Sequence, residues 1–145
     1  MPWKVNGQRW HLSDKGFPPG RKMHWDRALL PRLLEIVHEV EPNLRIEWDV
    51  RDTIKFYVPG VGRAWAQWRT KDTHGLDCKF MGKKGQLNLS RVEDFGVEPS
   101  VTAKESGDLL KLVFQRNEHV HAPRLKELLT EHLAGFREAF AKAKV

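Results

Sequence analysis

Cysteine is almost absent from this sequence, which contains a single one, Cys78, among its 145 residues. A lone cysteine cannot form an intrachain disulfide, and it cannot supply the several thiolates of a cysteine-based zinc site. Free thiols are typical of proteins from a reducing compartment. We therefore expect a cytoplasmic protein whose fold depends on its hydrophobic core.

Long apolar runs are also missing. No stretch approaches the roughly 20 apolar residues that a membrane-spanning helix needs. The N-terminal residues Met1–Gly7 contain no apolar segment of the kind found in a signal peptide. Because the sequence also has no internal repeat and no low-complexity tract, we expect a single domain, residues 1–145, without membrane contact.

Motifs that bind cofactors or metals are absent as well. Gly82-Lys83-Lys84-Gly85 resembles a phosphate-binding loop, but it lacks the required spacing and precedes no long helix, which favours a solvated hairpin loop. His119 and His121 offer only two metal ligands, whereas a structural zinc site needs four. The sequence therefore predicts no catalytic residue, no metal site and no cofactor.

Positive charge, in contrast, is in excess. Lysine and arginine number 25 against 19 aspartates and glutamates, which gives a net charge of +6 and a pI of about 9.6. Such a balance favours an anionic partner, for example nucleic acid, although many basic domains bind none. We further expect a monomer or a weak dimer.

Three of the six tryptophans, Trp3, Trp10 and Trp25, lie in a polar N-terminal stretch, residues 1–25. A proline-glycine segment in the middle of this stretch rules out a helix there. The transfer of an indole ring out of water is favourable. We therefore predict an ordered arm, residues 1–25, whose tryptophans dock on an α+β body, residues 26–145. The alternative is a free tail.

Two amphipathic helices are predicted, from about Asp26 to Glu41 and from about Pro123 to Lys142. Asp26 is a suitable N-cap for the first helix, and Pro123 suits the first turn of the second. In both helices apolar residues recur at helical spacing and form one face, namely Leu30, Leu33, Leu34, Val37 and Val40, then Leu125, Leu128, Leu129, Leu133, Phe136 and Phe140.

Alternation of apolar and polar residues predicts the strands. Four strands follow the first helix, at about residues 44–50, 54–58, 63–70 and 75–81, with short connections that imply an antiparallel meander. A short helix capped by Ser90 and ending near Phe95 comes next. Two further strands lie near residues 101–103 and 109–115. The expected fold class is α+β: a single antiparallel sheet of about six strands, with the N-terminal and C-terminal helices packed on one face.

The stretch Arg63–Phe80 interleaves basic and aromatic residues and is the main candidate for a binding site. Alternation turns the small residues of its first strand toward the core and leaves Trp65, between two arginines, on the opposite face. Aromatic rings stack on unpaired bases, and cations neutralise phosphates. The candidate nucleic-acid-binding residues are Arg63, Trp65, Arg69, Lys71, Lys79, Lys83 and Lys84.

The N-terminal arm supports two alternatives. In one, the arm covers Trp65, and the surrounding charges form only a solvated rim. In the other, the protein is a protein–protein interaction module in which Trp3, Trp10 and Trp25 anchor a partner, since aromatic residues commonly dominate such interfaces.

A further alternative is an enzyme acting on a small ligand, with His11, His24 or His119 as base. An isolated histidine has no mechanism without a partner, and no pair of carboxylates stands out beside these residues. Cys78 alternates with apolar residues on the core face, where a thiol is inert. Catalysis is therefore not the expected function.

Five segments carry a resemblance to a known family: Pro2–His11, Lys15–Pro18, Trp25-Asp26, Trp65–Thr70 and Asn88–Arg91. They are similar to a C-terminal extension found on the damage-sensing ATPase of the excinuclease ABC system in some bacteria, and the match spans nearly the whole chain. More distantly, the order of helix, meander and closing helix is similar to small α+β domains of the MmcQ/YjbR kind, some of which are suspected of binding DNA.

This resemblance implies a role in DNA repair. The parent protein is a DNA-damage sensor with ATPase modules and zinc fingers, but this chain has no Walker motif and no four-cysteine pattern. The resemblance thus implies a non-catalytic accessory domain, with DNA or a DNA-repair protein as its partner. No established functional residues carry over from the family.

Overall fold

The alternating residues of the central chain form one sheet of six antiparallel strands, in the order β1-β2-β3-β4-β6-β5. The computed structural model describes residues 1–141. The first four strands form a meander, after which β6 pairs with β4 and β5 lies at the edge beside β6. The strands are β1 (Arg45–Glu47), β2 (Thr53–Tyr57), β3 (Ala66–Arg69), β4 (Leu76–Gly82), β5 (Val97–Ala103) and β6 (Asp108–Phe114).

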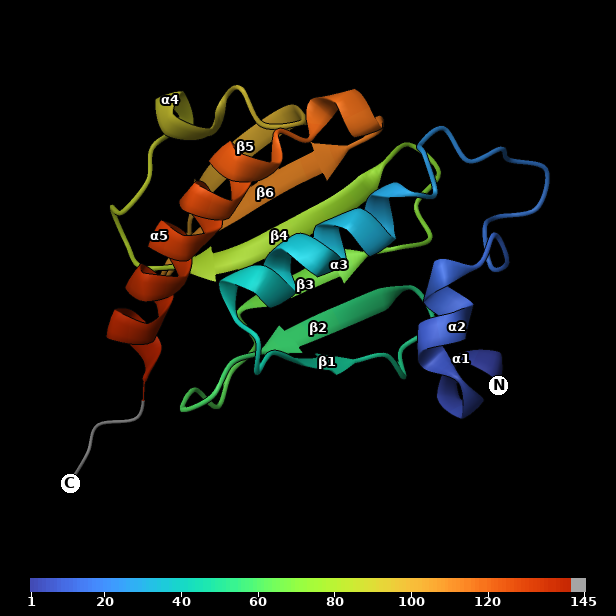
Figure 1. Ribbon diagram of the computed structural model, residues 1–145, viewed down its shortest axis with the longest axis horizontal. Coiled ribbons are helices and arrows are strands. Elements are labelled where there is room, and N and C mark those ends of the chain that lie inside the picture. Colours follow the sequence, from blue (N-terminus) through green and yellow to red (C-terminus); the bar gives the residue numbers. More distant parts are fainter. Residues whose placement is uncertain (142–145) are drawn as a thin grey trace.

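Two long helices, α3 (Leu29–Val40) and α5 (Ala122–Phe140), pack side by side on one face of this sheet (Figure 1). A single 3-10 turn, η1 (Asn117–His119), precedes α5. The predicted α+β class, with both helices on one face of an antiparallel sheet, is confirmed. Among residues 1–141, no helix combines the length and the apolar character needed to cross a bilayer.

Local capping shifts two helix starts from their predicted positions. α3 begins at Leu29 rather than at Asp26, because the Asp26 carboxylate caps a separate turn just ahead of the helix. The short helix α4 (Leu89–Val92) is capped by the side chain of Asn88, not by Ser90. Both sequence signals correctly mark the region in which a helix begins, but neither identifies the first helical residue.

Two strands are shorter than their alternation suggests. β1 ends at Glu47, so the alternating residues that follow it lie outside the sheet ladder. β3 begins at Ala66 rather than at Arg63, and this difference decides the position of Trp65. The predicted end of the last helix, at Lys142, lies outside the described residues.

The N-terminal arm contains two short helices, α1 (Pro2–Val5) and α2 (Gly7–Leu12), ahead of its proline-glycine segment. Trp10 and Trp25 donate their indole N–H groups to backbone carbonyls in the β1–β2 and β3–β4 connections, at 2.6 and 2.8 Å. The arm therefore docks at the end of the sheet where these connections lie, and the start of β3 lies at the other end (Figure 1). Trp65 immediately precedes β3.

Candidate nucleic-acid interface

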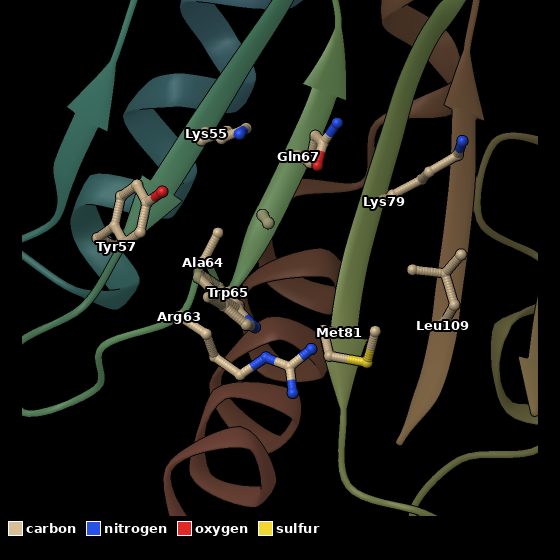
Figure 2. A pocket seen from close by; sticks show the side chains of 10 residues that line it. Lys55, Tyr57, Arg63, Ala64, Trp65, Gln67, Lys79, Met81 and Leu109 are labelled. Atoms are coloured by element: carbon tan, nitrogen blue, oxygen red, sulfur yellow. The ribbon is translucent and has the colours of Figure 1, made fainter. Parts of the chain in front are cut away.

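The sheet face opposite α3 and α5, here called the outer face, carries a line of long polar side chains. The strand register puts Lys55, Gln67, Lys79 and Lys111 side by side across β2, β3, β4 and β6. Figure 2 shows the first three on neighbouring strands. The lysines are half-buried and Gln67 is exposed. We call Lys55, Lys79 and Lys111 together with Gln67 the basic row.

Alternation along each strand creates the basic row. Lys79, for example, lies between Cys78 and Phe80, which are both buried in the core beneath the helices. Because successive residues of a strand point to opposite faces, burial of these neighbours turns Lys79 outward. The lysine stems lie along the sheet while their ammonium groups reach water, which explains why the side chains are half-buried rather than exposed.

The outer face is hollowed beside the basic row, over a volume of about 440 Å³. Tyr57, Arg63, Met81 and Leu109 line this hollow in addition to members of the basic row (Figure 2). One aromatic ring and two apolar side chains therefore lie next to several cations. This combination is suited to a ligand with both flat apolar groups and negative charge.

Tyr57 is the accessible aromatic residue of the hollow, since Trp65, which also lines it, is fully buried. The guanidinium carbon of Arg45 lies 4.4 Å from the centroid of its ring, an arrangement that is typical of a cation–π contact. Burial, and next the nearby charge of Glu47, raise the pKa of the Tyr57 hydroxyl. The phenol therefore stays neutral at physiological pH, and only the ring face that Arg45 does not cover can stack on a base.

Trp65 does not lie on the outer face, so its predicted position is wrong. Its side chain is fully buried, 5.2 Å from Phe80 and 6.2 Å from His132 between ring centroids, and its Nε1 donates a hydrogen bond to Nδ1 of His132 (3.0 Å). The Trp65 backbone is hydrogen-bonded to Phe56 and Met81 on the neighbouring strands, but Phe56 pairs with Ala66, so the regular alternation does not yet apply to Trp65. The indole packs beneath α5, so α5 rather than the arm removes it from the surface.

Arg69 lies on the sheet, but its guanidinium is already paired. Its Nε donates to Oδ2 of Asp72 (3.0 Å), and its NH2 group lies 3.7 Å from Oδ2 of Asp52. A phosphate would have to displace these carboxylates. Arg69 is therefore not a free cation of the interface.

Lys71 is buried and holds the arm to the body. Its Nζ donates hydrogen bonds to the carbonyls of Trp10 (2.8 Å) and Ser13 (3.0 Å). Burial lowers the pKa of Lys71 to about 8. The predicted role of Lys71 as a phosphate contact is therefore replaced by a structural one.

The other predicted cations are divided between two places. Arg63 is exposed and lines the hollow together with Lys79. Lys83 and Lys84 follow β4 and lie outside the sheet, and Lys83 is ion-paired with Glu138 at 2.7 Å. Of the seven predicted binding residues, Arg63, Lys79 and Trp65 line the hollow, but Trp65 is fully buried and offers no accessible surface there.

The arm tryptophans are engaged within the chain. Trp25 is buried, and Trp3 packs on Trp10 with 5.3 Å between ring centroids. Since all three rings contact other parts of the protein, they are not exposed anchors for a partner. This placement weighs against the interaction-module hypothesis.

The buried histidine and the cysteine are structural. Nε2 of His11 faces the Val50 carbonyl (2.7 Å), which can only accept, so Nε2 carries the proton and Nδ1 accepts from the Thr70 hydroxyl. Burial lowers the pKa of His11.

Burial raises the pKa of the Cys78 thiol well above its usual value, which makes it a poor nucleophile. Of the other two histidines considered as bases, His24 is exposed in the arm and His119 lies in η1.

Sequence reasoning missed Lys55, Tyr57 and Lys111. Each alternates with buried apolar residues, so the outward direction of its side chain could be inferred from the sequence. What the sequence did not give was the register that brings Lys111, more than fifty positions further along, into line with Lys55. The direction of each side chain could thus be inferred from its own strand, but the alignment of the strands with one another could not.

The chain was compared with protein-family models, with curated proteins and with solved structures, and none of these comparisons gave a match. The resemblance to the excinuclease extension therefore stays a prediction. What the outer face can bind follows from its charge, its shape and its exposed groups.

Proposed function

We propose that this protein binds single-stranded nucleic acid on the outer face of its sheet. The observation that carries the proposal is the basic row: three lysines in register across four adjacent strands. Neighbouring strands lie about 4.8 Å apart, so the row spans roughly 14 Å. The ammonium groups of Lys55 and Lys79 can follow the phosphates of an extended strand, and Lys111 can join them where a phosphate competes with Asp77, whose carboxylate lies 3.5 Å from its Nζ.

A single strand fits this face better than a duplex. The cations lie on a sheet surface beside a shallow hollow, whereas a duplex is generally read by a helix or ribbon that projects into a groove. The hollow also presents Tyr57, Met81 and Leu109, which can pack on unpaired bases. In a duplex those bases are stacked on one another and are not available.

The biological setting is part of the proposal. The resemblance to the excinuclease extension favours DNA as the polymer and an accessory role in DNA repair without catalysis of its own. A nucleic-acid partner and an unpaired Cys78 both suit a cytoplasmic location.

The proposal is tested with a variant that carries Lys55→Gln, Lys79→Gln and Lys111→Gln. Its affinity for a labelled single strand at low salt should fall by about 10-fold or more, because each lost phosphate contact also forfeits the release of counterions. Fluorescence anisotropy titrations of the full chain measure this change. Equal affinity of wild type and variant would refute the interface.

A matched control removes three positive charges from surfaces other than the outer face. Lys15, Lys22 and Lys126 are exposed on the arm and on α5 rather than on the outer face. Their combined change to glutamine should leave the affinity within about 2- to 3-fold of wild type, because only the general attraction of the net charge is lost. An equally large loss in both variants would mean that binding follows net charge and not the basic row.

Tyr57 separates a stacking site from a purely electrostatic one. Stacking of a base on an aromatic ring contributes about 1–3 kcal/mol, so Tyr57→Ala should weaken single-strand binding by roughly 5-fold or more, while Tyr57→Phe should bind like wild type. Duplex binding should respond little to either change. If the alanine variant binds single strands as tightly as the phenylalanine variant, stacking on Tyr57 is excluded.

A further inference from the structure

A second cluster of polar side chains lies where the β3–β4 connection enters β4. Carboxylate oxygens of Asp72 and Asp77 and an imidazole nitrogen of His74 all lie within 4.8 Å of one another. These are one nitrogen and two oxygen donors of the types that bind zinc and other divalent transition metals. No sequence motif marks these three residues as a set.

Asp77 gives the cluster an unusual feature. It is only 3% exposed, and its Oδ1 accepts no hydrogen bond from any residue between positions 1 and 141. Its other oxygen lies 3.5 Å from the Nζ of Lys111. A buried carboxylate oxygen without a donor costs free energy, and a bound cation would remove that cost.

The backbone of the connection is held by three hydrogen bonds from two distant segments. The carbonyl of Asp72 accepts from the Trp25 indole (2.8 Å), the carbonyl of Thr73 accepts from the backbone N–H of His24 (2.7 Å), and the carbonyl of His74 accepts from the Gln115 side chain (2.8 Å). The backbone of the two donor residues of the connection, Asp72 and His74, is thus fixed in place before any metal binds. Such pre-organisation reduces the entropy cost of forming a site.

The surrounding charges also favour a cation. Three carboxylates, those of Asp52, Asp72 and Asp77, face two cationic side chains, those of Arg69 and Lys111, which leaves one negative charge. Each carboxylate oxygen has two lone pairs, so Asp72 can accept from Arg69 and still coordinate a metal. In metal sites such second contacts orient the ligand.

We propose that Asp72, His74 and Asp77 form a binding site for a zinc ion. In a tetrahedral zinc site with bonds of about 2.0–2.1 Å the donor atoms lie about 3.3 Å apart, so the three groups must close in by at most about 1.5 Å from their present separation. Rotation of the exposed His74 side chain, together with small rotations of the two carboxylates, can supply this movement. Three protein ligands leave the fourth position to water.

The test is a titration of metal-free full-length protein with Zn²⁺ alone, monitored by isothermal titration calorimetry. Wild type should bind one equivalent saturably, and His74→Ala and Asp77→Asn should each weaken binding by about 10-fold or more, since each removes a direct ligand. His38→Ala, which removes an exposed histidine of α3, is the matched control and should bind like wild type.

Two outcomes would overturn the proposal: no saturation at one equivalent by wild type, or equal affinity in the His74→Ala and His38→Ala proteins. Because His74 is exposed, its replacement should not affect folding, so a loss of zinc binding in this variant cannot be attributed to an unfolded chain. Unfolding curves of the metal-free variants check this. Nucleic-acid binding is measured in the absence of metal, so the two proposals are tested separately.

Discussion

Trp65→Ala should lower the free energy of unfolding by about 3–5 kcal/mol, which is the usual cost of removing a buried aromatic side chain. Trp65 is among the largest fully buried residues, and it fills the space between the sheet and α5. The change also leaves Nδ1 of His132 without its donor. Trp65→Phe keeps most of the buried volume and should cost less than the alanine change.

Urea unfolding followed by far-UV circular dichroism measures these losses. Trp3→Ala is the comparison, because Trp3 is half-exposed in the arm and should cost clearly less. A loss below about 1 kcal/mol in Trp65→Ala would show that the indole is not in the core. The folded Trp65→Phe variant should bind single strands like wild type, because Trp65 does not reach the outer face, and a loss of binding would restore the original stacking hypothesis.

Acid should destabilise this protein through His132. Burial lowers the pKa of His132 to about 4, and the charge of Glu131 opposes this shift. Between about pH 6.5 and pH 4 the unfolded chain therefore binds a proton that the folded protein does not, so stability falls as the pH falls through this window. At pH 5 the expected loss from this group is about 2 kcal/mol relative to pH 7.5.

The structural reason is the hydrogen bond with Trp65. Nδ1 of His132 accepts from the indole N–H, so a proton on Nδ1 would remove the acceptor and place a charge in the core. His132→Asn offers an oxygen in a similar position without titrating in this range. Its stability should vary less between pH 7.5 and pH 5 than that of wild type, by about 2 kcal/mol.

His38→Asn is the control for this experiment, since His38 is exposed on α3. It should retain the wild-type pH dependence, including the contribution of His11, whose pKa is also lowered by burial. Urea midpoints measured at both pH values give the comparison. The same pH dependence in His132→Asn as in wild type would contradict the assignment.

The sequence was sufficient to predict the sheet, its α+β class and both long helices, because their signals are repeated many times. Leu33 and Val37 of α3, for instance, follow the helical period, and Cys78 follows the strand period, and all three are buried as that spacing requires. The ends of helices and strands were harder to predict, because a helix cap such as Asn88 depends on a single side chain.

The candidate site was less predictable than the fold. Trp65 has the alternation of an outward residue, but it lies one position ahead of β3 and is drawn inward by the space beneath α5 and by His132. That partner is 67 positions away, so no local pattern contains it. The same limit applies to Lys111, whose alignment with Lys79 depends on β6 pairing with β4 instead of with a following strand.

The salt dependence of single-strand binding tests the proposed function most directly. Three phosphate contacts at about 0.7 each predict a slope of about −2 in a plot of log affinity against log salt concentration, which is a loss of about 20-fold between about 50 and 200 mM. The variant that lacks Lys55, Lys79 and Lys111 should show a slope close to zero. Equal slopes in the two proteins would contradict the assignment of the basic row as the nucleic-acid interface.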